Sequence, residues 1–187
     1  MIGIDEVGRG AWAGPLLIVA VRPKITLPVG LADSKKLTRM QREVLLPHII
    51  KLCDVGEGWV SAVEIDNQGL AESMKSGVGR ALKAISALHS EEIILDGPVN
   101  YVATEYRNAK VVVKADEKIP EVSAASIYAK VTRDRYMSQS SMQYLDFHFE
   151  TNVGYGTPEH KAALWEHGPI IGVHRFSFKP IVLVVSR

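Results

Sequence analysis

Short apolar runs alternate along this chain with longer segments whose apolar residues recur at helical spacing. Apolar runs at 2–7 and 15–21 predict two strands, and the second is typical of a strand covered on both faces because it is apolar throughout. Alternation over 57–65 predicts a third strand. Two shorter apolar runs, ending at Asp96 and Asp116, predict two more.

Helical signals separate these strands. The capping-box pattern at 38–41 predicts a helix to about Cys53, which Pro47 should kink or end early. Apolar spacing predicts further helices over 66–89 and 121–138. Gly77 and Gly79 weaken the first of these in its middle. Strands first, then alternating helix and strand, predict a three-layer α/β domain with a mixed sheet.

Composition narrows the class of protein. A chain of 187 residues predicts one domain over 1–187, in which the placement of a tail at about 175–187 stays open. Hydrophobic residues at 47% and charged residues at 23% exclude disordered, collagen-like and coiled-coil classes. A net charge of +1 gives no whole-protein attraction to a polyanion, although a local basic patch can still bind one.

The sequence also bears on compartment and redox chemistry. The lone cysteine, Cys53, excludes an intramolecular disulfide and a thiolate metal cluster, and its apolar neighbours predict a buried thiol. No apolar run approaches the roughly 18 residues of a membrane span, and the N-terminus lacks the pattern of a secretory signal. We therefore expect a cytoplasmic protein without membrane contact.

Carboxylates stand at the ends of three predicted strands. Asp5 and Glu6 precede a glycine-rich loop, Asp96 ends the run "IILD", and Asp116 ends "VVVKAD". Strand ends at one edge of an α/β sheet are where ligands bind, and acids gathered there repel one another unless protonated or bound to a cation. Oxygen-only ligands favour Mg²⁺ or Mn²⁺ over zinc. The pattern predicts an acidic metal site for phosphoryl chemistry.

Two features leave this prediction open. Adjacent residues on a regular strand point to opposite faces, so for Asp5 and Glu6 to share one site the strand must bulge or end, or one of them must contribute through its carbonyl. Strand-end Asp residues are also common turn formers, and Asp96 before Gly-Pro fits that simpler interpretation.

Six segments carry a resemblance to a known family. The segments "GIDEVGRGAWAGPL", "DSKKL", "ILDG", "AASIYAKVTRDR", "GYGTPEH" and "HRFSF" occur in the order found in type 2 ribonuclease H, so that the chain resembles bacterial-type ribonuclease HII from Ile2 to about Phe178. The resemblance implies the ribonuclease H-like fold, a five-stranded mixed sheet flanked by helices. It implies a metal-dependent endonuclease that hydrolyses the RNA strand of RNA–DNA hybrids.

The resemblance also assigns the acidic residues. Asp5, Glu6, Asp96 and Asp116 would be the catalytic, metal-binding carboxylates for two divalent cations, Mg²⁺ or Mn²⁺, and cleavage would leave 3′-hydroxyl and 5′-phosphate ends. The family usually has Lys-Gly-Asp where this chain has Ala115 before Asp116. Because alanine is strained at a glycine-only backbone angle, the placement of Asp116 is the open point, with Glu117 and Asp134 as alternatives.

A second set of residues would recognise the substrate. The resemblance implies that Gly8, Arg9 and Gly10 read the ribonucleotide 5′ to the cut through its 2′-hydroxyl, and that Tyr155 packs on the deoxyribose beyond it. Single ribonucleotides embedded in duplex DNA would then be incised on their 5′ side. Without the resemblance, Tyr155 would be interpreted as an aromatic loop anchor.

Basic residues form two candidate phosphate-contacting patches. Lys36 and Lys130 occupy motif positions, and their neighbours Arg39, Arg42, Arg133 and Arg135 complete the patches. A solvated helix face is the alternative for each arginine. Ser126 suits either helix packing or phosphate binding. His160 and His174 are expected to be structural hydrogen-bonding residues.

Several alternatives remain. Ribonuclease HIII normally carries Gly-Lys-Gly where this chain has Arg9 between two glycines, and it has an additional N-terminal domain. A catalytically silent hybrid-binding module would not need four carboxylates, and a DNA nuclease would not need the Gly-Arg-Gly and Tyr155 motifs. The C-terminal segment lacks a glutamine-plus-paired-aromatic motif for a sliding clamp. We therefore expect a monomer that acts on RNA–DNA hybrids and ribonucleotide-containing DNA without an obligate protein partner.

Overall fold

The computed structural model describes residues 1–27 and 37–186. The chain divides into two compact units that are interleaved along the sequence. The sheet unit contains Met1–Val7, Leu17–Trp59 and Met74–Val131, and the helical unit contains Gly8–Leu16, Val60–Ser73 and Thr132–Arg187. The expectation of a single catalytic domain stays a prediction.

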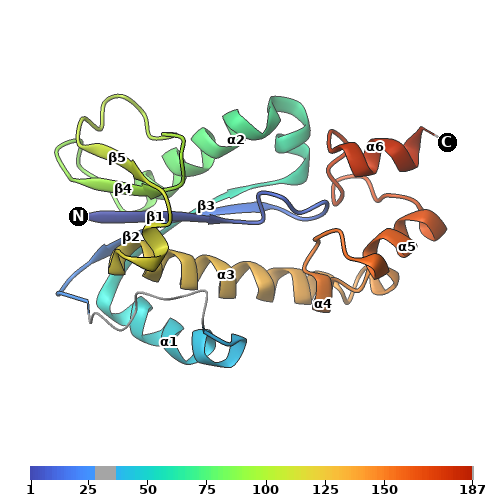
Figure 1. Ribbon diagram of the computed structural model, residues 1–187, viewed down its shortest axis with the longest axis horizontal. Helices are drawn as coiled ribbons and strands as arrows, with labels where there is room; N and C mark the ends of the chain where they lie inside the picture. The colour runs from blue at the N-terminus through green and yellow to red at the C-terminus, as the bar shows by residue number, and fades with distance from the viewer. Residues whose placement is uncertain (28–36, 187) are drawn as a thin grey trace. The chain divides into compact units, whose positions relative to one another are not determined.

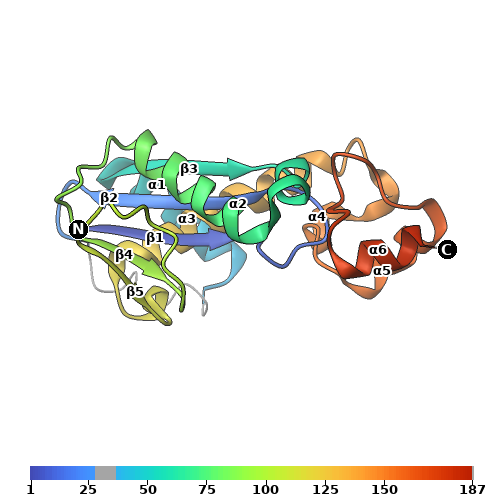
Figure 2. The same cartoon turned by 90° about the horizontal axis from the view of Figure 1, so that it is seen from above.

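A five-stranded mixed sheet forms the centre of the sheet unit, as predicted (Figure 2). Its strand order is β3-β2-β1-β4-β5, with β1 antiparallel to β2 and the pairs β1–β4 and β4–β5 parallel. The strands are β1 (Ile2–Val7), β2 (Leu16–Pro23), β3 (Cys53–Val60), β4 (Ile93–Asp96) and β5 (Ala109–Val112). β5 ends before Asp116, which lies instead in the 3₁₀ turn η3 (Ala115–Glu117).

Helices cover both faces of this sheet. α1 (Arg39–Leu52) and the first half of α3 (Pro120–Ser140) lie on one face, and the second half of α2 (Ala62–Ala84) lies on the other (Figure 1). Val7 and the alternate residues of β2 pack against α1 and α3 in one buried apolar cluster. On the opposite face, α2 lies so close that a Cβ at Gly77 would overlap the side chain of Ile18.

The helix boundaries show which local signals decided the structure. The capping box at Thr38 is present, because its hydroxyl accepts from the Gln41 amide while the Gln41 side chain accepts from the Thr38 amide. α1 continues through Pro47, so of the two alternatives for this proline, an early end of the helix was wrong. α2 breaks at Gly69, which has φ 78° and ψ 164°, and not at the glycines near its middle.

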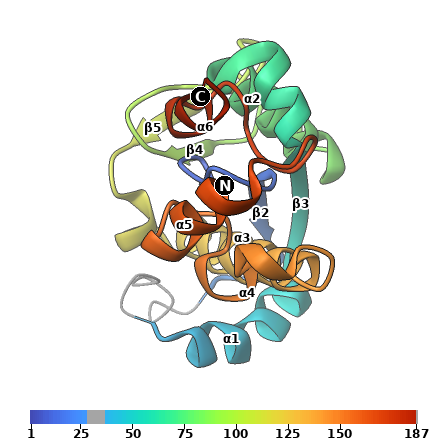
Figure 3. The same ribbon diagram turned by 90° about the vertical axis from the view of Figure 1, so that its right-hand side faces the viewer.

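The helical unit contains the short helices α4 (Phe149–Asn152), α5 (Pro158–His167) and α6 (Lys179–Val185) (Figure 3). Phe147, Phe149, Leu164 and Ile181 form the centre of its apolar core. α6 accounts for most of the tail that the sequence pattern left unplaced. None of the helices in residues 1–27 and 37–186 is both long and apolar enough to cross a membrane.

Candidate active site

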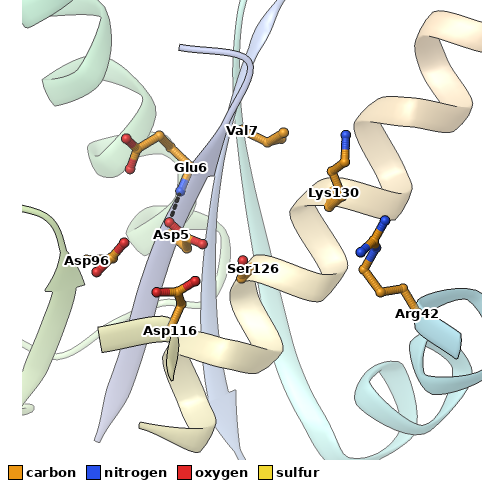
Figure 4. A pocket seen from close by; sticks show the side chains of 8 residues that line it. All are labelled: Asp5, Glu6, Val7, Arg42, Asp96, Asp116, Ser126 and Lys130. Carbon is orange, nitrogen blue, oxygen red and sulfur yellow. Dashed lines mark hydrogen bonds between the residues drawn. The ribbon is translucent and has the colours of Figure 1, made fainter. Parts of the chain in front are cut away.

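The predicted carboxylates border one pocket of about 420 Å³ in the sheet unit (Figure 4). Four acids, two bases, one hydroxyl and one apolar residue form its lining: Asp5, Glu6, Asp96, Asp116, Arg42, Lys130, Ser126 and Val7. The acids come from three separate segments of the chain, and the bases come from two different helices. The structure therefore brings all four predicted carboxylates to one place.

The sheet creates this pocket where two parallel strands part. β1 and β4 pair only over Ile2–Ile4 and Ile93–Leu95. Asp5 and Asp96 are the next residues on each strand, at the carboxyl ends where ligands bind in open α/β sheets. The turn η3, which follows β5, adds Asp116.

Asp5 and Glu6 reach the pocket without a bulge. β1 keeps an unbroken antiparallel register with β2 through Asp5, Glu6 and Val7, so a bulge, one of the alternatives left open for these residues, is absent. The two carboxylates point in different directions in Figure 4, as alternation along a strand requires. Both nevertheless line the cavity because it opens beside β1 where the pairing with β4 has ended.

Asp5 lies in a strongly unfavourable environment for a negative charge. Its side chain is buried, and burial raises the pKa of its carboxyl to about 8, with Glu6 and Asp96 adding to the rise by charge repulsion. The hydrogen bond with Ser126 and the one from the Glu6 amide (2.8 Å) lower this pKa by a smaller amount. The free protein therefore holds a proton at this site near neutral pH, and a bound cation would displace it.

Asp96 fixes the turn that carries Asp116. One Asp96 carboxylate oxygen accepts a hydrogen bond from the Ala115 amide at 2.7 Å. The left-handed residue of this turn is Lys114, with φ 57°, whereas Ala115 is buried in η3 and has no positive φ. The strain expected at Ala115 is therefore absent, and Asp116 faces the pocket while the alternatives Glu117 and Asp134 do not line it.

The basic residues predicted for phosphate contact lie in different environments. Lys130 on α3 and Arg42 on α1 both border the pocket, whereas Lys36 lies outside the described residues. Arg39 and Arg135 are exposed. Arg133 is fully buried and donates to three backbone carbonyls in the described chain, so its prediction as a phosphate contact was wrong.

The loop after β1 belongs to the helical unit and contains the Gly-Arg-Gly motif. The Gly8 amide donates to the Tyr155 hydroxyl at 3.1 Å, which joins two predicted recognition elements. Gly8 has φ 85°, and a Cβ there would overlap the Arg133 guanidinium. Gly10 is different, because its φ is not positive and a Cβ would meet no described atom within 4 Å. Packing therefore requires glycine at position 8 but not at position 10, which is exposed.

Two buried histidines hold the Tyr155 segment. The Ile170 amide donates to Nδ1 of His174, so Nε2 of His174 carries the proton that it shares with Nε2 of His160 at 3.1 Å. Nδ1 of His160 then donates to the Tyr155 carbonyl at 2.9 Å. Burial lowers the pKa of both rings, that of His174 to about 4, so both are neutral, structural hydrogen-bonding residues as predicted.

Sequence reasoning missed the role of the two buried arginines. Arg133 and Arg175 both have no exposed surface, and both donate to the loop over residues 9–15. Their sequence context, "TRDR" on a helix and "HRFSF" near the end of the chain, carries no signal of burial. Arginine is rarely buried without an acidic partner, so pattern reasoning assigns such residues to the surface.

Comparison with known proteins agrees with the geometry. The family model for Ribonuclease HII matches residues 2–181. Ribonuclease HII of Streptomyces avermitilis is 40% identical over 178 residues, covering 94% of this chain and 75% of that protein. Ribonuclease HII of a Geobacillus species is also 40% identical, covering 96% of this chain but 64% of that protein.

Solved structures extend the likeness to the fold. The structure of the PCNA:RNase HII complex from Archaeoglobus fulgidus contains a chain that matches with a TM-score of 0.79 and 28% identity, over 94% of this chain and 92% of that one. Its likeness agrees with the five-stranded mixed sheet and its flanking helices. The chain therefore belongs to the ribonuclease HII family, and its enzyme class is that of the ribonucleases H.

Proposed function

We propose that this protein is a metal-dependent endoribonuclease that cleaves the RNA strand of RNA–DNA hybrids and incises 5′ to single ribonucleotides in duplex DNA. The products would carry 3′-hydroxyl and 5′-phosphate ends. The observation that carries the proposal is the convergence of four carboxylates and two bases on one pocket of the sheet unit. The ribonuclease H activity follows from family membership, and the junction specificity is the finer part of the proposal.

The donor set of the pocket fits hard divalent cations. Its acidic lining offers only oxygen ligands, with neither cysteine nor histidine among the lining residues, which suits Mg²⁺ or Mn²⁺. Within the described residues, no three side chains of histidine, cysteine, aspartate or glutamate already lie where they could hold one metal ion together. The four carboxylates of the pocket would therefore have to turn toward the ions. Two bound cations would supply an activated water and charge stabilisation at the leaving oxygen.

The protein's own groups would prepare the site for this chemistry. Asp5, held by Ser126 and the Glu6 amide, would lose its proton when a cation binds. Asp96 would keep the turn with Asp116 against the pocket through the Ala115 amide. Lys130 and Arg42 would bind phosphate oxygens of the substrate strand, a contact without sequence preference.

The Gly-Arg-Gly loop supports the finer proposal. Gly10 is exposed and is required by neither packing nor backbone angle, which suits a position where a ribose approaches the backbone closely. Arg9 would contact a phosphate, and Tyr155, tied to the Gly8 amide, would pack on the neighbouring deoxyribose. The motif follows Glu6 by two residues in the chain, so substrate reading and chemistry are encoded in one short segment.

Partner and compartment remain predictions. The Archaeoglobus relative was solved in complex with PCNA, and that is a property of that protein. For this chain we propose action as a monomer in the cytoplasm without an obligate protein partner. Gel filtration at low micromolar concentration tests the monomer, and a stable dimer peak would contradict it.

The first experiment is cleavage of a labelled DNA duplex that contains one ribonucleotide, with Mg²⁺, with Mn²⁺ and with EDTA. An Asp96→Asn variant, an all-DNA duplex and a continuous RNA–DNA hybrid serve as controls. Incision 5′ to the ribonucleotide that disappears with EDTA and in the variant supports the whole proposal. Cleavage of the hybrid alone removes the junction specificity, and inactivity on both substrates favours a hybrid-binding module.

A further inference from the structure

Two fully buried arginines, Arg133 and Arg175, donate hydrogen bonds to the backbone of the Gly-Arg-Gly loop. Arg133 donates from Nε to the Pro15 carbonyl at 2.8 Å and from an Nη to the Ala13 carbonyl at 3.1 Å. Its other Nη donates to the Val153 carbonyl at 2.9 Å, two residues before Tyr155. The Arg133 guanidinium also lies over the Tyr155 ring, 5.5 Å from the ring centre.

Arg175 binds carbonyls of the same loop. Its Nε and one Nη both donate to the Gly14 carbonyl, at 3.1 and 3.0 Å, and the other Nη donates to the Arg9 carbonyl at 3.0 Å. The Arg175 amide donates to the Trp12 carbonyl. The carbonyls of residues 9 and 12–15 therefore all accept hydrogen bonds from these two arginines.

This arrangement decides which backbone groups the loop presents outward. The Gly8 carbonyl is used by the Ala11 amide, and the amides of residues 12 and 13 donate to the Gly154 carbonyl. Within the described chain, Gly10 has no such partner for its amide or its carbonyl, and it is exposed. The two arginines thus bind the carbonyls of residues 9 and 12–15, while the backbone of Gly10 is left open to a ligand.

Folding alone gives a weak reason for two buried guanidinium groups. Burial lowers the pKa of both, that of Arg175 to about 9, and the hydrogen bonds that the described structure gives them go to carbonyls and not to carboxylates. Replacing buried charged groups by apolar residues is often neutral or stabilising. The fork of a guanidinium, however, can hold several carbonyls in fixed positions, which apolar side chains cannot do.

We propose that Arg133 and Arg175 are positioning residues for ribonucleotide recognition, because they fix the loop over residues 8–15 in the conformation that presents Gly10 and seats Tyr155. The inference rests on the proposed function, in which this loop reads the 2′-hydroxyl. It assigns no contact with substrate to either arginine. Their effect would therefore fall on discrimination between substrates and not on cleavage in general.

The test compares Arg133→Lys and Arg175→Lys with a matched control, Arg22→Lys. Lysine keeps the charge but loses the fork, and Arg22 is a half-buried arginine of the sheet unit that bonds Asp54, Glu91 and the Ile85 carbonyl. The readouts are kcat/KM on a single-ribonucleotide duplex and on a continuous hybrid, the melting temperature, and hydrogen–deuterium exchange of the segment 8–16.

We expect kcat/KM on the single-ribonucleotide duplex, divided by kcat/KM on the continuous hybrid, to fall by about tenfold in both loop variants, equivalent to about 1.4 kcal/mol. In Arg22→Lys this ratio should stay constant. Exchange in segment 8–16 should rise in the loop variants alone. If Arg133→Lys does not fold, Arg175→Gln decides, since it retains a donor for Gly14 but cannot also reach Arg9.

Two outcomes in the variants would overturn the inference alone. If both substrates lose activity by the same factor, in line with the melting temperature, the arginines are structural only. An unchanged ratio with unchanged exchange would have the same consequence. A wild-type protein that does not cut single ribonucleotides would remove the proposed junction specificity, and this inference with it. Failure of the inference alone would appear only in the variants, so the two failures are distinguishable.

Discussion

The carboxylate pocket of the sheet unit and the Gly-Arg-Gly loop of the helical unit bury charge in opposite ways. In the pocket, acids from β1, β4 and η3 lie together, and burial with charge repulsion raises the pKa of Asp5 to about 8. In the loop, Arg133 and Arg175 are more deeply buried, yet each donates three hydrogen bonds to backbone carbonyls. The charges that shift the pKa of Asp5 are those of the acids Glu6 and Asp96, although Arg42 and Lys130 also border the pocket. In the loop, carbonyl dipoles solvate the two cations.

The difference separates a binding site from its scaffold. The charge of Asp5 is disfavoured by burial and by its acidic neighbours, so it costs stability in the free protein, and a cation from outside would relieve that cost. Arginines satisfied by the chain itself need no external partner and instead order the backbone. Substitutions in the two regions should therefore affect stability with opposite signs.

The largest expected effect comes from Asp5→Asn. Cleavage should fall by about 10³-fold, because losing a metal ligand removes several kcal/mol of transition-state stabilisation. In metal-free buffer the same variant should be more stable than wild type. A raised folded-state pKa means that the contribution of this carboxyl to stability is fully present below about pH 4 and is lost progressively as pH rises from there through about 8.

Urea denaturation of the metal-free protein at about pH 5 and pH 8 measures this effect. The gain from Asp5→Asn should be larger at the higher pH, and added Mg²⁺ should stabilise wild type but not the variant. Asp54→Asn is the matched control, since Arg22 lowers the pKa of the Asp54 carboxyl and its loss should slightly destabilise the same unit. An Asp5→Asn variant less stable than wild type at pH 8 would remove the contrast between pocket and loop.

The two glycines of the loop sharpen the comparison from the other side. Gly8→Ala should destabilise the protein by about 3 kcal/mol, because alanine is strained at φ 85° and its Cβ would overlap Arg133. Gly10→Ala should leave the melting temperature nearly unchanged and raise KM on a single-ribonucleotide duplex. Thermal melts and steady-state kinetics of both variants check this, and a stable Gly8→Ala protein would contradict the loop geometry.

The sequence predicted the pocket better than the loop for a physical reason. Strand ends are visible in an apolar pattern, and acids that follow them must meet at one edge of the sheet, so Asp5, Asp96 and Asp116 could be placed together before the structure was known. Lys130, which was singled out by its motif position, borders the same pocket, and its contact with phosphate stays a prediction. Nothing local distinguishes Arg133, which is buried, from Arg135, which is exposed, although both lie on the same helix.

Backbone conformation was the other limit. The Gly-Pro after Asp96 marks the end of β4 in the sequence, but nothing there shows that β1 pairs with β4 only over Ile2–Ile4. Of the alternatives left open for Asp5 and Glu6, the bulge does not occur, and it is the pairing of β1 with β4 that ends before them. Likewise, α2 breaks at Gly69, whereas Gly77 stays helical and packs closely against Ile18. Helix propensity alone treats the two glycines alike.

Lowering the pH should reduce the stability of the helical unit, while it removes the cost of the charged Asp5 carboxylate in the pocket. The folded-state pKa values of His160 and His174 are lowered, so their contribution to stability is present above about pH 6.5 and is lost as pH falls toward 4. We expect a loss of about 2 kcal/mol between pH 7 and 4.5 from His174. His174→Gln should reduce this pH dependence, while His48→Gln, an exposed histidine on α1, should leave it unchanged.

The measurement is urea denaturation of the three proteins at both pH values. A His174→Gln variant with the same pH dependence as wild type would mean that the buried histidine pair is not the titrating element. Tyr155 gives a local check, since its carbonyl accepts from His160 and its segment should exchange faster at pH 4.5.

The smallest expected effect concerns the turn between Asp96 and Asp116. Ala115 is buried with an ordinary backbone angle, so Ala115→Gly should destabilise by about 0.5–1 kcal/mol without a gain in activity. Lys114 carries the left-handed angle, so Lys114→Gly should be neutral or stabilising, because relief of strain offsets the greater freedom of the unfolded chain. Chemical denaturation of the pair decides between them. If Ala115→Gly is the stabilising variant, the backbone strain lies at position 115 and not at Lys114. The hydrogen bond from the Ala115 amide to Asp96 would then hold this residue in an unfavourable backbone conformation.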